Sequence, residues 1–162
     1  MIALGAALRD GAVLAVAASA LVMGSLRMNP RLYMRHFPVA LKNRLPPLSA
    51  EEARTGRLVG LALLGLLLGG PLVSAWFAAP PSPSAVFLHA FVVGMVFNLV
   101  DWLVLDELWI DRLRPRWALP PGAAIEDFLP FDHARHFRGF VTGTVLCAAI
   151  AAFATAVVEV LG

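Results

Sequence analysis

Residues Leu58–Ala79 read LVGLALLGLLLGGPLVSAWFAA, a run that contains no charged side chain and a single hydroxyl group. A helix needs about 20 predominantly apolar residues to cross the hydrocarbon core of a bilayer. Inside lipid, the backbone polar groups of such a run can be satisfied only by the hydrogen bonds of the helix itself. The run therefore predicts a transmembrane helix.

Three other stretches have the same character, and the chain as a whole is strongly apolar. The 162 residues are 59% hydrophobic with a mean hydropathy of +0.77, whereas soluble domains contain about 45–50% apolar residues. We therefore predict an all-α, polytopic membrane protein that forms one domain of four transmembrane helices. Their expected ranges are about 11–28, 50–79, 85–108 and 132–161, joined at the basic end by loops 29–49 and 109–131.

The first of these segments carries two charges on its N-terminal side. We expect Arg9 and Asp10 to interrupt the helix there, so that it begins near Gly11. Ala18-Ser19-Ala20 has the small residues of a signal-peptidase site, and cleavage there would leave three spans. We expect the segment to be kept as a helix.

The basic residues predict the orientation of the four helices. Twelve of the thirteen Lys and Arg residues lie in two connections, seven within 27–57 and five within 106–138, whereas residues 78–84 carry no charge. Because Lys and Arg accumulate in cytoplasmic loops, both basic connections should be cytoplasmic and both termini should face outward. The excess of Arg over Lys is typical of a bacterial genome rich in GC, which indicates a bacterial inner membrane. Since these charges flank apolar spans, no nucleic-acid partner is predicted.

Local patterns indicate how the helices begin and pack. Ser49-Ala50-Glu51-Glu52 is a capping box, which predicts a helix start at Ala50. Gly69-Gly70-Pro71 predicts a kink in the outer half of that helix. Glycines also recur at a spacing of four residues, which lets helix backbones approach closely, either within the chain or between copies of it. These pairs are Gly56 with Gly60, Gly65 with Gly69, and Gly139 with Gly143.

Polar residues inside the third span are candidates for function, because they are costly in lipid. Asn98 and Asp101 stand three residues apart and share a helix face, so the amide could orient the carboxylate. Asp101 could carry a proton, bind a cation, or pair with an arginine of the first basic connection. His89 lies about 18 Å away along the helix and cannot share a metal with Asp101. We expect His89 to form a hydrogen bond at a helix interface.

The segment Asp132-His133-Ala134-Arg135-His136 has the most suggestive spacing for chemistry. Helical spacings of three and four residues could bring His133 or Asp132 beside His136, as zinc or iron sites require. A coordination shell or general bases could come from acidic residues of the same connection: Asp106, Glu107, Asp111, Glu126 and Asp127. Alternatively, Asp132 caps the last helix and the charges form a solvated rim. No cofactor is predicted; if one binds here, it is a divalent metal.

Three short segments resemble parts of small bacterial multi-pass membrane proteins of unknown activity. They are Asn29-Pro30-Arg31, Leu88-His89-Ala90-Phe91 and Phe97-Asn98-Leu99-Val100-Asp101. The resemblance implies a membrane fold and brings no reaction, cofactor or partner with it.

The sequence is therefore compatible with three hypotheses for the function of the protein. We expect a small integral membrane protein that acts through helix packing and binding, as a homo-oligomer or as an accessory subunit of a membrane complex. Arg31 and Arg35, helped by Arg44, would bind anionic headgroups of membrane lipids, with Asn98 and Asp106 as further binding residues. The first alternative is an enzyme at the cytoplasmic interface that uses Asp101, His133 and His136 on a lipid-like or isoprenoid substrate. The second alternative is a small transporter.

Overall fold

The computed structural model describes residues 4–113, 115–129 and 133–161, and all regular structure in those ranges is helical. Four helices are long and apolar enough to cross a membrane. This confirms the prediction of an all-α, polytopic membrane protein. The four are α1 (Leu4–Met28), α3 (Ala50–Ala78), α4 (Pro83–Val100) with its continuation η2 (Asp101–Leu113), and α5 (His133–Leu161).

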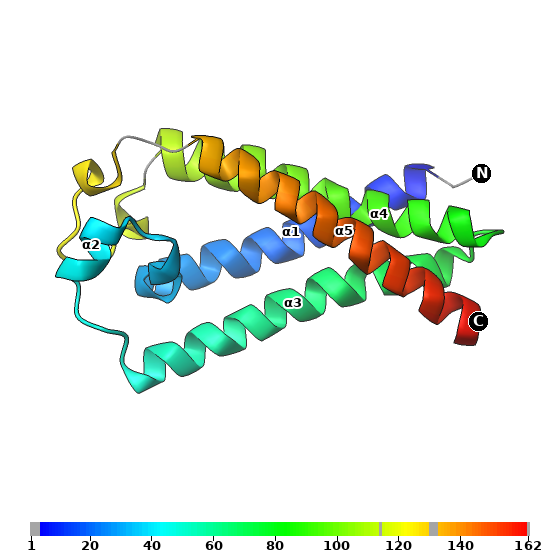
Figure 1. The fold of residues 1–162 in the computed structure, drawn as a ribbon, viewed down its shortest axis with the longest axis horizontal. Coiled ribbons are helices and arrows are strands. Elements are labelled where there is room, and N and C mark those ends of the chain that lie inside the picture. The colour runs from blue at the N-terminus through cyan, green and yellow to red at the C-terminus, as the bar shows by residue number, and fades with distance from the viewer. Residues whose placement is uncertain (1–3, 114, 130–132, 162) are drawn as a thin grey trace.

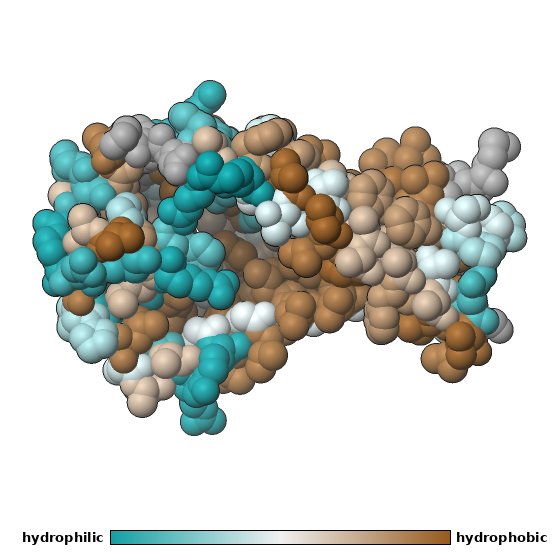
Figure 2. All heavy atoms as spheres, in the orientation of Figure 1, coloured by the Kyte–Doolittle hydropathy of each residue, from teal (hydrophilic) through white to brown (hydrophobic). Residues whose placement is uncertain are grey.

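The long helices run along one axis of the molecule (Figure 1). α1 begins and α5 ends at the same end, which we call the terminus end. The opposite end, which we call the connection end, holds four short elements (Figure 1): η1 (Pro30–His36), α2 (Val39–Arg44), η3 (Arg116–Ala118) and η4 (Ile125–Phe128). In Figure 2 hydrophobic residues cover the middle of the molecule and hydrophilic residues gather at the connection end, as a membrane protein requires.

The first helix is longer than its sequence suggested. It begins at Leu4, so the expectation that Arg9 and Asp10 interrupt it is wrong. The two charges pair with each other at 2.8 Å, and the Asp10 carboxylate also accepts a hydrogen bond of 2.7 Å from Ser74 of α3. Because these groups have partners within the protein, the helix can continue through them.

The second span begins as its capping box predicts. The Glu52 N–H donates to the Ser49 hydroxyl at 3.1 Å, and the Ser49 N–H donates to the Glu52 carboxylate at 2.8 Å, so the prediction is confirmed. The helix ends at Ala78, one residue before the expected end, and Ala79 turns the chain with a φ of 41°. Pro71 lies inside the helix and is buried.

The other two spans differ from expectation mainly at the connection end. The third begins at Pro83, where the Ser82 hydroxyl accepts the Ala85 N–H, and it runs to Leu113 instead of about residue 108. Its last 13 residues form the π-helix η2, which no sequence pattern had indicated. The fourth is described from His133, and the loops 29–49 and 109–131 contain η1, α2, η3 and η4.

The helices are buried to very different extents. Within their most apolar windows, 39% of the residues are buried in α4 with η2 and 33% in α1, but only 11% in α3 and in α5. Small residues allow the contacts: a Cβ on Gly11 would meet Val96 at 2.8 Å, and one on Gly70 would meet Leu14 at 3.0 Å. α4 is therefore the centre of the bundle, and much of α3 and α5 is left to face lipid or a partner.

Candidate metal centre

The π-helix η2 determines how the acidic residues of the third span are arranged. In an α-helix, residues five apart diverge by roughly 140° around the axis. A π-helix closes each hydrogen bond over five residues, so such residues return to nearly the same side. Asp101, Asp106 and Asp111 have this spacing, and single-turn π segments occur often at functional sites.

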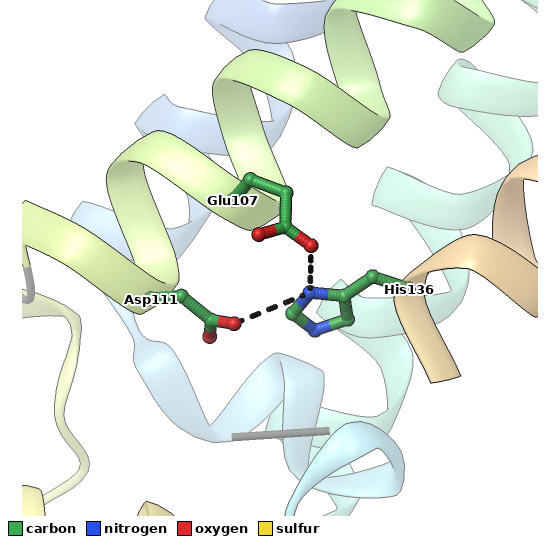
Figure 3. Close-up of side chains that lie close together, drawn as sticks. All are labelled: Glu107, Asp111 and His136. Atoms are coloured by element: carbon green, nitrogen blue, oxygen red, sulfur yellow. Dashed lines mark ion pairs between the residues drawn. The ribbon is translucent and has the colours of Figure 1, made fainter. Parts of the chain in front are cut away.

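Glu107 and Asp111 of η2 meet two histidines at the start of α5. We call Glu107, Asp111, His133 and His136 the acidic–His cluster. Nδ1 of His133 lies 2.9 Å from Oε2 of Glu107 and 3.7 Å from Oδ2 of Asp111. Nδ1 of His136 lies 3.5 Å from Oε1 of Glu107 and 3.4 Å from Oδ2 of Asp111. In Figure 3 both carboxylates point from η2 toward the imidazole that α5 supplies.

The distances around His136 are too long for hydrogen bonds. N–H···O bonds span about 2.7–3.2 Å, and Nδ1 of His136 is a buried atom with no hydrogen-bond partner among the described residues. Bonds of about 2.0–2.1 Å from a tetrahedral metal ion hold neighbouring ligand atoms roughly 3.3–3.4 Å apart. The separations of 3.4 and 3.5 Å match this spacing. One atom each from Glu107, Asp111 and His136 fits the geometry of a shared cation, with all three atoms within 4.8 Å of one another.

The cluster is partly enclosed. The side chain of Asp111 is 4% exposed and that of His136 16%, whereas that of His133 is 65% exposed. Two carboxylates and one imidazole suit zinc, manganese or iron. If a cation were held by these three residues, a coordination position would be left open, and exposed His133, whose Nδ1 lies 2.9 Å from Glu107, would be the nearby candidate for a fourth ligand or a proton acceptor.

Asp101 and Asp106 lie near the acidic–His cluster. Asp106 lies within electrostatic range of His136, Glu107, Asp111 and Arg135, and Asp101 lies within range of Asp106 and His136. No ion pair joins Asp101 to an arginine of residues 29–49 in the described part of the chain. These two aspartates therefore extend the row of acidic side chains on η2 beyond the cluster.

Asn98 has a different environment from the one its spacing to Asp101 suggested. Its Nδ2 donates to the Phe140 carbonyl and to the Thr144 hydroxyl, both at 3.1 Å. The residue is 7% exposed and packs against Gly143, whose lack of a Cβ leaves the room it occupies. Asn98 thus links α4 to α5 through its hydrogen bonds to Phe140 and Thr144.

The arginines proposed to bind lipid make contacts inside the protein. Arg31 pairs with Glu52 at 2.8 Å and donates to the carbonyls of Pro46 and Pro47, and its side chain is 13% exposed. Arg35 is exposed and donates to Nε2 of His36 at 2.9 Å. Lipid binding by Arg31 and Arg35 stays a prediction.

Arg44 joins the two connections by an ion pair with Asp127. A hydrogen bond of 2.9 Å from the Ala124 N–H and the ion pair with Arg44 hold the pKa of Asp127 below its usual value. Phe37 and Phe128 pack edge to face in the same region, 5.5 Å apart. α2 and η4 therefore form one cap over the connection end.

The structure brings only part of the predicted metal set together. His133 and His136 lie at the cluster, and Asp132 falls outside the described residues. The prediction that His89 forms a hydrogen bond at a helix interface is confirmed: its Nε2 lies 2.8 Å from the Ser74 hydroxyl of α3, and the residue is 1% exposed. Sequence reasoning missed that Asp10 belongs to the same group, 2.7 Å from the Ser74 hydroxyl. The sequence feature that could have indicated this group is Asp10, a lone carboxylate within an apolar helix.

Comparisons with known proteins add nothing to this geometry. The chain matches no protein-family model, no curated protein and no solved structure. Its class is defined by the fold alone, as a small multi-pass α-helical membrane protein.

Proposed function

We propose that this membrane protein binds a divalent cation through Glu107, Asp111 and His136, on the cytoplasmic side of a bacterial inner membrane. The observation that carries the proposal is the position of His136, whose Nδ1 has no hydrogen bond to any residue that the structure describes and lies 3.4 and 3.5 Å from two carboxylate oxygens. We assign this end to the cytoplasmic side because the basic residues lie in the two connections here.

An open coordination position gives such a site a chemical use. A zinc ion held by three protein ligands lowers the pKa of a bound water to about 7, which supplies a nucleophile at neutral pH. Exposed His133 lies where it could accept a proton from that water. The proposal therefore favours an enzyme at the membrane surface over a purely structural role for this end.

Metal content of purified protein tests the proposal. Protein in detergent is equilibrated with Zn²⁺ or Mn²⁺, desalted and analysed for metal, and we expect about one ion per chain. H136A and E107Q should lower the affinity for the ion by at least about tenfold.

The matched control is H36A, which removes a histidine from the same end but outside the acidic–His cluster. H36A should retain the metal. A wild-type protein that binds no more metal than H136A, or an equal loss in H36A, would contradict the proposal.

A second candidate, assembly through a helix face, is favoured by the surface of α3. A Cβ on Gly65 or Gly69 would meet nothing within 4 Å, and few residues of this span are buried. Small residues at a spacing of four drive helix association in lipid, so we propose a homo-oligomer or an accessory subunit that packs through this face. G65L should dissociate the assembly in light-scattering measurements, and G60L, about 140° around the helix, should not. A protein that stays monomeric at all concentrations would rule out the homo-oligomer.

A further inference from the structure

A groove of about 650 Å³ lies between η2 and the start of α5, next to the acidic–His cluster. One part of its wall is apolar and consists of Trp102, Leu103, Leu108 and Phe137. The other part carries Glu107, Arg112 and His133. The groove is thus amphipathic, and it lies at the end of the third span.

The apolar wall is placed to meet lipid. Leu103 is 49% exposed, Leu108 41% and Phe137 51%, although all three belong to helices that can cross a membrane. Trp102 stacks on Phe140 at 4.6 Å, which keeps its ring fixed at the base of this wall. Tryptophan is enriched where a bilayer meets water, so the groove lies at headgroup depth with its apolar part toward the acyl chains.

The polar wall holds one guanidinium, that of Arg112, and one carboxylate, that of Glu107. No hydrogen bond or ion pair joins Arg112 to another residue within 4–113, 115–129 and 133–161. The nearby carboxylate of Glu107 is already occupied, because its Oε2 lies 2.9 Å from Nδ1 of His133. A guanidinium with unused donors binds phosphate oxygens with two parallel hydrogen bonds.

From this complementarity we propose that the groove binds an anionic glycerophospholipid from the cytoplasmic leaflet. Its phosphate lies on Arg112, and its acyl chains follow Leu103, Leu108 and Phe137. Glu107 and His133 line both the groove and the acidic–His cluster, so the phosphate lies beside the open coordination position. The inference goes beyond cation binding and does not require the metal, but together the two sites describe an enzyme whose substrate is a phospholipid.

Lipid binding by the intact protein tests the inference. Purified protein in a neutral detergent is titrated with didecanoyl phosphatidylglycerol or didecanoyl phosphatidylcholine, and bound lipid is counted by native mass spectrometry. We expect phosphatidylglycerol to bind with about tenfold higher affinity than phosphatidylcholine, because both lipids carry the phosphate but the choline ammonium of phosphatidylcholine offsets the negative charge that Arg112 would meet. Binding should persist after chelation of metal ions, so failure of the metal proposal would be separate from failure of this one.

Two variants locate the site. R112Q should lower the affinity for phosphatidylglycerol about tenfold and that for phosphatidylcholine by a smaller factor, because the phosphate of phosphatidylcholine is already offset by its choline ammonium. A134W, which fills the groove, should abolish binding of both. R116Q removes an exposed arginine that does not line this groove and should have no effect.

Three results would overturn the inference. The first is equal binding of the two lipids, which would mean an apolar surface without headgroup recognition. The second is an equal loss in R116Q, which would mean diffuse attraction to charge. The third is displacement of the lipid by millimolar inorganic phosphate, which would mean a site for a free anion.

Discussion

At the scale of single residues, the helices are held together by a few polar contacts. Ser74 of α3 bridges Asp10 of α1 and His89 of α4 with hydrogen bonds of 2.7 and 2.8 Å. S74A leaves a buried imidazole without this partner, so we expect it to lower the free energy of unfolding by about 1–3 kcal/mol. Thermal unfolding in detergent measures the loss. S19A is the control, because the buried Ser19 hydroxyl has no hydrogen-bond partner among the described residues, and its removal should be neutral.

A second prediction concerns two glycines one helical turn apart. A Cβ on Gly143 would collide with the Asn98 amide, whereas one on Gly139 would meet nothing within 4 Å. G143A should therefore break the Asn98 contacts to α5 and lower the free energy of unfolding by about 1–3 kcal/mol. G139A should be neutral or stabilise by up to about 1 kcal/mol, because alanine is the better helix former. Equal effects of the two substitutions would show that Asn98 does not depend on this space.

These residues also show what a single sequence can reveal. Gly139 and Gly143 look equivalent in the sequence, and only the position of α4 separates an open glycine from one that admits a neighbour. The capping box of Ser49 and Glu52 could be predicted because all its groups lie within four residues. The contact of Asp10 with Ser74 could not, because its 64-residue separation depends on how α1 and α3 pack.

At the scale of elements, the end of α3 is strained. Ala79 caps this helix with a φ of 41°, a left-handed conformation that costs a residue with a side chain roughly 1–2 kcal/mol. A79G should raise the free energy of unfolding by about 1 kcal/mol, since glycine adopts this conformation freely. A78G, one residue earlier and still helical, should lower it by up to about 1 kcal/mol. Thermal unfolding of the two variants should therefore shift in opposite directions.

The connection end should respond to pH through His36. Loss of water around the ring and the positive charges of Arg35, Arg135 and Lys42 lower the pKa of His36 in the folded protein. Below the ordinary value of about 6.5 the unfolded chain therefore binds more protons, so stability falls as the pH drops from there toward the lowered pKa. Between pH 7.5 and 5.5, wild-type protein should lose more thermal stability than H36Q. An equal loss in both proteins would remove His36 from the pH response.

The acidic–His cluster combines a local spacing in the sequence with a contact between two helices, and only the local spacing could be predicted. The spacing of His133 and His136 is local, and it correctly placed both side chains on one side of α5. Their partners Glu107 and Asp111 stand four residues apart, a spacing that places both carboxylates on one face of an ordinary α-helix as well. The sequence could therefore indicate this pair, whereas the packing of η2 against α5, which brings the carboxylates to the histidines, could not be read from local spacing.

At the scale of the whole molecule, every proposal depends on which side of the membrane holds the connection end. Twelve of the thirteen basic residues lie in the two connections, which predicts that the connection end faces the cytoplasm. Single cysteines at Asn43 of α2 and Glu126 of η4 should therefore be protected from an impermeant thiol reagent in intact cells, and become reactive when the membrane is opened. A cysteine at Ser84, an exposed residue in the first turn of α4, should react in intact cells.

The native Cys147 gives little background in this experiment, because it is half-buried inside α5 and packs against Gly94. If Asn43 and Glu126 sites both react in intact cells, the orientation is reversed and the metal and phospholipid sites face outward. Should the two sites react from different sides, α2 and η4 could not form one cap over the connection end. The labelling pattern thus tests the fold and the location of its chemistry together.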